Sequence, residues 1–325
     1  MKKLISIIIP AYNEEKTLPL LYRRLLLLMK KHSKYDFEII IIENGSYDNT
    51  YHVLKKIRDK DKRFKIIQLS RNFNPVGGQR AGLMHAKGDA AVLMFADLQD
   101  PPEIISQFLK EWEKGNEIVY GVITKRNGVS LIRKIISPIF YSIVNFLTEG
   151  KLPKNATDFR LMDKKVYTQI NKMQEHNQYI RGLDIWTGFK QKGVPYVRAA
   201  RVARGGGAGG ADDFNLVKFL YNTISFMSDG VFSYSTLPLK LISLSGILIS
   251  FITFLSSIYL IIFHILHGTS HPGYVRGYTS SLLITLFLFG VMFFFMGILG
   301  EYIARIYDEV KNRPNYIIRE KLGFS

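Results

Sequence analysis

Residues 4–14 read LISIIIPAYNE, an apolar run from Leu4 to Ile9 that passes directly into a polar segment. Three similar short runs, rich in Ile, Val and Phe, follow at Phe37 to Ile42, Phe64 to Leu69 and Ala90 to Phe95. Helical stretches such as Glu15 to Lys31 and Asp48 to Arg58 separate them. Strands that alternate with helices predict βαβ units, and hence an α/β fold with a mostly parallel, Rossmann-like sheet.

A polar segment follows each predicted strand. These segments are Tyr12-Asn13-Glu14, Glu43-Asn44-Gly45-Ser46, Ser70-Arg71-Asn72 and Asp97-Leu98-Gln99-Asp100. Because the carboxyl ends of parallel strands lie at one edge of a sheet, and ligands bind at that edge, we expect the four segments to form one site.

Asp97 and Gln99 are candidates for a metal site. They stand two apart after a buried strand, so extended backbone would point both side chains the same way. One carboxylate and one amide oxygen, completed by phosphate oxygens and water, suit Mg²⁺ or Mn²⁺. The alternative interpretation is a helix N-cap, with Pro101 and Pro102 opening a helix after Asp100.

Composition narrows the function classes. The 325 residues carry 44 Lys and Arg against 27 Asp and Glu, a net charge of +17, and no cysteine. The absence of cysteine excludes disulfides, thiolate metal sites and a cysteine nucleophile. A basic chain can bind nucleic acid, but attraction of basic residues to anionic lipid explains the charge as well. We expect a lipid bilayer as partner and no nucleic acid.

Two uncharged apolar runs, Leu241 to Ile265 and Thr279 to Gly300, predict two transmembrane helices. Each exceeds the roughly 20 residues that cross the hydrocarbon layer as a helix. Arg276 is the single Lys or Arg between them, at His267 to Tyr278, whereas the segment after Gly300 is rich in both. The positive-inside rule therefore places the N-terminal domain and both termini in the cytoplasm, in a multi-pass protein of the cell inner membrane.

These patterns divide the chain into four parts. We predict a cytoplasmic domain at 1–215, a juxtamembrane amphipathic helix at 216–236, two transmembrane helices within 237–305 and a cytoplasmic tail at 306–325. Within the first part, residues 131–147 show apolar positions at helical spacing behind a basic approach. That pattern suits a helix in the lipid interface and, equally, an ordinary core-facing helix.

The motifs, taken in order, resemble a known family. They are Ile8-Ile9-Pro10-Ala11-Tyr12-Asn13-Glu14-Glu15, Glu43-Asn44-Gly45-Ser46-Tyr47-Asp48, Leu69-Ser70-Arg71-Asn72-Phe73, Ala81-Gly82-Leu83, Ala86-Lys87-Gly88-Asp89, Ala96-Asp97-Leu98-Gln99-Asp100-Pro101-Pro102-Glu103 and Asp158-Phe159-Arg160-Leu161-Met162-Asp163. From Ser6 through the second apolar run the chain resembles family 2 glycosyltransferases of the polyprenyl-phosphate type, which include bactoprenol glucosyltransferases and dolichol-phosphate mannose synthase.

The resemblance implies a GT-A domain that faces the cytoplasm and requires Mg²⁺ or Mn²⁺. Such a domain would transfer one hexose, such as glucose, from a UDP- or GDP-sugar to polyprenyl (undecaprenyl) phosphate with inversion. The lipid-linked sugar would then serve cell-envelope glycan modification. The resemblance also allows a homotetramer.

The resemblance further assigns residues to roles. Asp97 and Gln99 would hold the metal, and Asp158 and Arg160 would face the reaction centre. The nucleotide-sugar would be bound by Pro10, Ala11, Tyr12, Glu14, Glu43, Asn44, Asp48, Arg71 and Asp97. Asp158 could act as a base or could orient the acceptor or Arg160. Its other interpretation is a helix N-cap or a buried Asp–Arg pair.

An arginine must neutralise the acceptor phosphate, because two anions would otherwise repel each other. We favour Arg201, which leads into the glycine-rich stretch Gly205 to Gly210, and place Arg126 second. The phosphate needs no strong base, since its second pKa is near 6 and it is mostly deprotonated at pH 7.

The chain departs from the family pattern at three places. Glu43 and Asn44 stand where two aspartates are usual, and Phe95 replaces an aspartate two residues before Asp97. The usual Ser-Lys pair is replaced by Gly205 to Asp213. Because of these departures, one alternative is a catalytically impaired membrane scaffold that recruits a flippase or an envelope enzyme. A polysaccharide synthase with the same donor domain is the other alternative that stays open.

Overall fold

The computed structural model describes residues 2–126, 156–173, 175, 180–199 and 278–324, with scattered helical positions between 239 and 266. The chain divides into two units. Unit 1 contains Met1–Gly230 and Arg313–Ser325, and unit 2 contains Val231–Asn312. The predicted interface helix at 131–147 and juxtamembrane helix at 216–236 lie outside the described residues.

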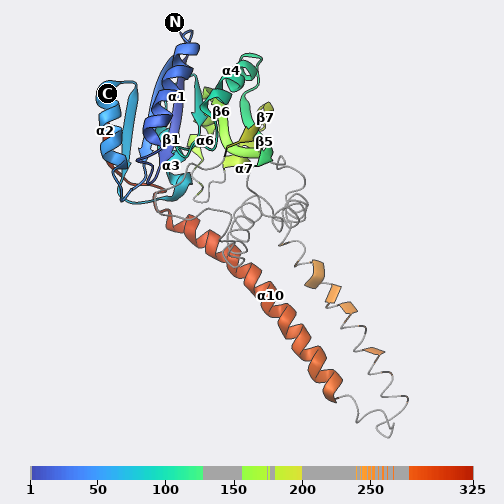
Figure 1. Cartoon of the computed structure of the whole chain (residues 1–325). Coiled ribbons are helices and arrows are strands. Elements are labelled where there is room, and N and C mark those ends of the chain that lie inside the picture. Colours follow the sequence, from blue (N-terminus) through green and yellow to red (C-terminus); the bar gives the residue numbers. More distant parts are fainter. Residues whose placement is uncertain are drawn as a thin grey trace. The chain divides into compact units, whose positions relative to one another are not determined.

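The described strands of unit 1 form one eight-stranded sheet in the order β7-β5-β6-β4-β1-β2-β3-β8 (Figure 1). Their bounds are β1 Leu4–Ala11, β2 Asp36–Glu43, β3 Phe64–Leu69, β4 Ala90–Leu93, β5 Ile118–Arg126, β6 Ala156–Asp163, β7 Gln191–Arg198 and β8 Ile318–Leu322. The strands β3-β2-β1-β4 run parallel, which confirms the predicted parallel core. The sheet as a whole is mixed, because β6 and β8 pair antiparallel with their neighbours.

Helices alternate with the strands along the sequence and pack against the sheet. The described helices of unit 1 are α1 Leu18–Lys31, α2 Thr50–Lys60, α3 Asn74–His85, the short 3₁₀ turn η1 Pro102–Ile104, α4 Ile105–Glu113, α6 Lys164–Lys172 and α7 Ile180–Trp186. The predicted helices at Glu15 to Lys31 and Asp48 to Arg58 are thus confirmed as α1 and α2, with ends shifted by a few residues.

Alternation along β1 places side chains on both faces of the sheet. Ile5, Ile7 and Ile9 belong to the core cluster that includes the apolar faces of α1, α2 and α4. On the other face, a Cβ atom added to Gly82 of α3 would lie 2.2 Å from Ile8 Cγ2. The glycine therefore allows α3 to approach the sheet more closely than any larger residue would permit.

The predicted tail at 306–325 contains a strand that the sequence analysis did not predict. Residues 318–322 form β8, which pairs with the outer edge of β3. Ser70 donates its backbone N–H to the Ile317 carbonyl oxygen at 2.9 Å, and Tyr51 of α2 donates to Glu320. Figure 1 shows the C-terminus beside α2. An unpaired β3 edge explains the difference, because it offers backbone partners to any extended segment that can reach it.

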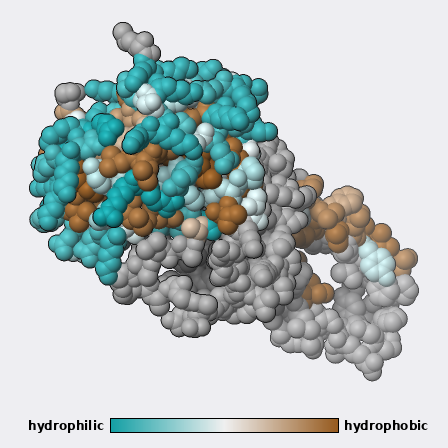
Figure 2. Space-filling model, turned by 45° about the horizontal axis from the view of Figure 1, so that its top comes forward, coloured by the Kyte–Doolittle hydropathy of each residue, from teal (hydrophilic) through white to brown (hydrophobic). Residues whose placement is uncertain are grey.

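Unit 2 contains α10, Tyr278–Lys311, a helix of 34 residues. The predicted run Thr279 to Gly300 lies within it, and the helix continues through residues assigned to the tail. Its segment Leu288–Lys311 is the one helix in the described part of the chain that is long and apolar enough to cross a membrane. Figure 2 colours the described surface of this unit mainly as hydrophobic, and Phe293, Phe294 and Ile303 are each more than 60% exposed (64%, 66% and 65%).

The first predicted span, Leu241 to Ile265, is described at scattered positions only, and these are helical. The described residues therefore confirm a helix for the second run and do not confirm a hairpin of two transmembrane helices.

A buried polar network joins β1, β2 and β3 near their amino-terminal ends, opposite the polar loops. Glu38 of β2 accepts hydrogen bonds from Ser6 Oγ at 2.5 Å, Lys65 Nζ at 2.6 Å and the Lys87 backbone N–H at 2.8 Å. Burial alone would raise the pKa of Glu38, but these hydrogen bonds outweigh it and hold the pKa below its ordinary value of 4.5. The carboxylate is therefore bound in its charged form.

We expect Glu38→Gln to destabilise the full chain near pH 7 by about 3 kcal/mol, because Lys65 loses a buried partner. Since the folded-state pKa of Glu38 is depressed, its contribution is complete above pH 4.5 and is lost as pH falls through the lower folded-state value. The wild-type minus variant difference in melting temperature, measured in detergent, should therefore shrink on acidification. Glu103→Gln, at the exposed ion pair with Arg24, is the matched control and should cost far less. A difference that stays constant with pH would contradict this role.

Candidate functional site

The carboxyl ends of the parallel strands surround a cavity of about 420 Å³. It is lined by Pro10, Ala11, Tyr12, Glu14, Asn44, Asn72, Asn74, Pro75, Phe95, Ala96, Asp97, Gln99 and Arg198. Every one of the four predicted polar segments contributes to this wall. The predicted convergence at one edge of the sheet is therefore confirmed, because parallel strands deliver their following loops to the same side.

Positive φ angles at Gly45 and Asn13 shape two of the loops around the cavity. Gly45 has a φ of 70°, and a Cβ atom at this position would lie 2.5 Å from the Arg71 carbonyl carbon. The loops after β2 and β3 are thus in direct contact. Asn13 has a φ of 56°, and its Oδ1 atom accepts the Tyr47 backbone N–H at 2.9 Å. Asparagine tolerates this conformation better than most residues, and here it joins the loops after β1 and β2.

Asn44 lines the cavity and also holds its wall. Its Nδ2 atom donates to the Asn74 carbonyl oxygen at 3.0 Å, and its Oδ1 atom accepts the Phe73 backbone N–H at 2.9 Å. The side chain therefore fixes the start of α3 beside the end of β2.

Three residues predicted to bind the nucleotide-sugar are not among those that line the cavity. Glu43 is buried and accepts the Ser46 backbone N–H at 2.5 Å. Asp48 accepts backbone N–H groups of Glu15 and Thr50, and Arg71 donates to the Asn72 carbonyl oxygen. In the structure these side chains stabilise the loops that form the wall.

Asp97 and Gln99 both line the cavity, although not through extended backbone. The strand β4 ends at Leu93, and Leu98 adopts a φ of 58°, so a tight turn presents the two side chains. A left-handed leucine is unusual and costs conformational energy, a kind of strain that often occurs at functional sites. The Asp100 N-cap alternative is wrong, because Pro101 precedes the helical turn and the Asp100 carboxylate bonds elsewhere.

The donor set suits a hard divalent cation that also binds substrate oxygens. Asp97 supplies a carboxylate and Gln99 an amide oxygen, whereas Phe95 supplies no ligand. Within the described ranges, no group of three or more His, Cys, Asp or Glu side chains could hold a metal ion. Mg²⁺ and Mn²⁺ are commonly bound by one or two carboxylates together with phosphate oxygens and water, so the residues present fit such an ion.

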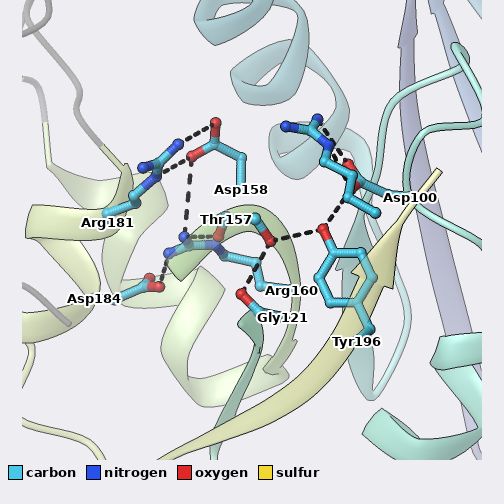
Figure 3. Close-up of polar contacts among 9 residues, drawn as sticks. Asp100, Gly121, Thr157, Asp158, Arg160, Arg181, Asp184 and Tyr196 are labelled. Carbon is cyan, nitrogen blue, oxygen red and sulfur yellow. Dashed lines mark hydrogen bonds and ion pairs between the residues drawn. The ribbon is translucent and has the colours of Figure 1, made fainter. Parts of the chain in front are cut away.

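Asp158 and Arg160 lie on β6, which runs antiparallel beside β4 in a register that pairs Leu93 with Arg160. The first residues of β6 therefore lie at the edge where β4 ends, next to the turn with Asp97. Figure 3 shows Asp158 facing Arg181 of α7. Arg181 donates from Nε to Oδ1 at 2.7 Å and from Nη2 to Oδ2 at 3.0 Å, a bidentate pair.

Beneath this pair, Arg160 is 2% exposed and donates to Asp184 and to the Thr157 carbonyl oxygen (Figure 3). Burial raises the pKa of Asp184, against the opposing influence of Arg160. Burial also tends to raise the pKa of Asp158, but Arg181 and then Arg160 outweigh it and lower the pKa to about 2. Asp158 therefore stays charged at any physiological pH. The Asp–Arg pair that we considered for Asp158 is thus observed with Arg181, in partly buried form, and a second, fully buried pair joins Arg160 to Asp184.

A third group connects Asp100 with β7. Asp100 is 1% exposed, accepts a hydrogen bond from Tyr196 Oη and forms an ion pair with Arg198, whose Nε atom lies 3.2 Å from Oδ1. Burial raises the pKa of Asp100, while Arg198 and Tyr196 oppose the shift and the nearby charges of Asp97 and Asp158 add to it. Asp97, Asp100 and Asp158 therefore lie close enough for the charges of Asp97 and Asp158 to affect Asp100.

The two predicted acceptor-phosphate arginines are not tested by the structure. The backbone of Arg126 ends β5 and is the register partner of Arg198 on β7. Its side chain and the whole of Arg201 lie outside the described residues.

The residues of the site that sequence reasoning missed include Arg181, Asp184, Tyr196 and Arg198. A signal was present for the last two, because both lie in the stretch Tyr196-Val197-Arg198-Ala199-Ala200-Arg201, which ends at our first candidate for the acceptor phosphate. The first two lie on a short helix with no motif that we used, so their partners emerge only in the fold.

Comparisons with known proteins agree with this geometry. The sequence model "Glycosyl transferase family 2" matches residues 6–170. The uncharacterized glycosyltransferase YkcC of Bacillus subtilis is 37% identical over 318 residues, covering 98% of this chain and 94% of the relative. The uncharacterized glycosyltransferase sll0501 of Synechocystis is 37% identical over 319 residues, covering 98% and 96%. The bactoprenol glucosyl transferase of Shigella phage SfII is 35% identical over 316 residues, covering 97% of each. The chain therefore belongs to glycosyltransferase family 2 and is a glycosyltransferase.

Proposed function

We propose that this protein transfers a single hexose, such as glucose, from a UDP- or GDP-sugar to polyprenyl phosphate at the cytoplasmic face of the inner membrane, with inversion at the anomeric carbon. The observation that carries the proposal is the cavity at the strand ends, where Tyr12, Asp97 and Gln99 meet. A relative that covers nearly the whole chain is named a bactoprenol glucosyl transferase, which supports a lipid phosphate as acceptor.

In this proposal Pro10, Ala11, Tyr12 and Glu14 hold the base and ribose, with Asn44 fixing the wall beside them. Asp97 and Gln99 would hold Mg²⁺ or Mn²⁺, which when bound supplies positive charge to the departing nucleoside diphosphate. Glu43, Asp48 and Arg71 contribute by holding loops rather than by contact with the ligand.

The reaction needs no proton transfer. An oxygen of the acceptor phosphate forms the new bond to the anomeric carbon, the bond to the donor's diphosphate breaks, and its electron pair leaves with the nucleoside diphosphate. Because the phosphate monoester is largely dianionic at pH 7, it is already nucleophilic. A carboxylate with a pKa of about 2 is a poor base, so we assign Asp158 to holding Arg181 at the reaction centre. Arg201 and Arg126 remain our candidates for the acceptor phosphate.

The connectivity of the sheet supports a multi-pass topology. Strand β3 precedes α10 in sequence and β8 follows it, yet the two are hydrogen-bonded in one sheet. If α10 crosses the membrane, the chain must therefore cross an even number of times, because a single crossing would separate β3 from β8. The first apolar run, Leu241 to Ile265, supplies the second crossing in this proposal.

The absence of cysteine allows a direct test of this topology. We expect Lys60→Cys and Lys321→Cys to react with a membrane-impermeant maleimide only after cells are permeabilised. Gly273→Cys, between the two apolar runs, should react in intact cells. Labelling of Lys321→Cys but not Lys60→Cys from outside would refute an even number of crossings.

Activity is tested with the purified full chain, a panel of radiolabelled UDP- and GDP-sugars, undecaprenyl phosphate and Mg²⁺ or Mn²⁺. We expect a lipid-soluble, acid-labile product carrying one sugar, which EDTA abolishes. Asp97→Ala should lower the rate by about 100-fold or more, because charge on the leaving group is no longer neutralised. The control Asp61→Asn changes a carboxylate that pairs with Arg63 just before β3, at the end of the sheet opposite the cavity. This variant should keep full activity.

Each alternative predicts a different result in this assay. A scaffold gives no product with any donor, and a polysaccharide synthase gives a polymer. Turnover that resists both EDTA and Asp97→Ala would remove the metal assignment.

The pH dependence of kcat/KM distinguishes a base from an orienting group. We expect the rate to fall on acidification with an apparent pKa near 6, where the acceptor phosphate gains a proton, and to show no ionisation of Asp158. Asp158→Asn should lower kcat by about 100-fold, because Arg181 loses its bidentate partner. The same acidic limb should persist in this variant. If the limb disappears in Asp158→Asn, then Asp158 acts as the base.

A further inference from the structure

The described residues that line the cavity carry more negative than positive charges. Among the described residues that line it, Glu14 and Asp97 are acidic and Arg198 is the one with a positive charge. A nucleoside diphosphate would bring further negative charge into this space. Such a ligand needs cations beside it, because like charges at short range disfavour binding. Arg198 was not among the residues that the sequence predicted for the site.

The buried carboxylate of Asp100 forms an ion pair with Arg198. Asp100 is 1% exposed, whereas the Arg198 side chain is 27% exposed and lines the cavity, so the ion pair has a buried anionic member and an outer cationic one. Arg198 donates a hydrogen bond from Nη2 to Asp100 Oδ2 at 3.4 Å, and its Nε atom lies 3.2 Å from Oδ1 at ion-pair distance without forming a hydrogen bond. A guanidinium group has further N–H donors, and those on Nη1 are not used in this pair.

The surroundings restrict the position of this arginine. Tyr196 Oη donates to Asp100 from the same strand, β7. Directly after Arg198, the Ala199 backbone N–H donates to the Gln99 carbonyl oxygen at 3.0 Å. The end of β7 is therefore bonded to the same turn that presents Asp97 and Gln99, and the arginine is fixed relative to the candidate metal ligands.

We propose that Arg198 binds the diphosphate of the nucleotide directly, and that Asp100 and Tyr196 are positioning residues that hold its guanidinium toward the cavity. This inference rests on the proposed function, since it names a further residue for the same donor. An arginine fixed in advance by a buried carboxylate binds a phosphate with little loss of side-chain freedom. It also supplies charge at the site where Phe95 supplies none.

The test measures binding rather than turnover. UDP, GDP and the corresponding nucleosides are titrated into the purified full chain in EDTA, so that a metal ion cannot mediate the contact. We expect Arg198→Gln to weaken binding of the preferred nucleoside diphosphate by about 10- to 100-fold while the nucleoside with the same base binds as before. Asp100→Asn should weaken diphosphate binding by a smaller factor and should also leave the nucleoside unaffected.

Loss of Arg198 leaves Asp100 buried without its cation, so folding is checked by melting temperature. The double variant Arg198→Gln/Asp100→Asn removes both charges and should fold while showing the same loss of diphosphate binding. Arg63→Gln, which breaks an arginine–aspartate pair at the end of the sheet opposite the cavity, should bind both ligands like the wild type.

The outcomes separate this inference from the proposed function. Unchanged diphosphate binding in folded Arg198→Gln, or an equal loss for nucleoside and diphosphate, overturns the inference. An effect confined to the KM for undecaprenyl phosphate overturns it too, since the arginine would then bind the acceptor. If the wild type binds no nucleoside diphosphate with or without Mn²⁺, the proposed function itself fails.

Discussion

The antiparallel pairing of β6 with β4 is the constraint on which the site depends. It inserts a strand from a later part of the chain beside the parallel core and places Arg160 opposite Leu93. As a result, residues more than fifty positions apart in sequence, Asp97 and Asp158, influence the same buried carboxyl group of Asp100. Without this pairing, the parallel strands would still form a cavity, but the acidic and basic groups of β6 would lie elsewhere.

Buried charge within this site is organised as pairs. Arg160 with Asp184, Arg181 with Asp158 and Arg198 with Asp100 each join a cation to a carboxylate. Pairs of this kind add little net stability, because desolvation opposes their attraction, but they fix the direction of the side chains. A transferase that relies on positioning and charge neutralisation gains from such rigidity, since the groups need not reorganise during the reaction.

Strand β8 joins the sheet to residues that follow α10 in the sequence. Strand β8 covers the outer edge of β3, and Ser70 at the start of the next loop bonds to Ile317. That loop continues into Asn72 and Asn74, which line the cavity. The segment that follows α10 therefore supports the loop from which Asn72 and Asn74 line the cavity, and none of its own described residues lines it.

The sequence alone determined the parallel core, the helices α1 and α2 and the meeting of four polar segments at one edge, because these follow from local periodicity and from the shared direction of parallel strands. Motifs also led to the prediction of Asp97, Gln99, Asp158 and Arg160 as site residues; Asp97 and Gln99 line the cavity, whereas Asp158 and Arg160 lie on β6 outside its described lining. Only the tertiary structure decided that Asp158 pairs with Arg181, that Asp100 holds Arg198, and that residues 318–322 complete the sheet. Those contacts join elements distant in sequence, and burial and partner choice, which set the charge of each carboxyl group, exist only once the chain has folded.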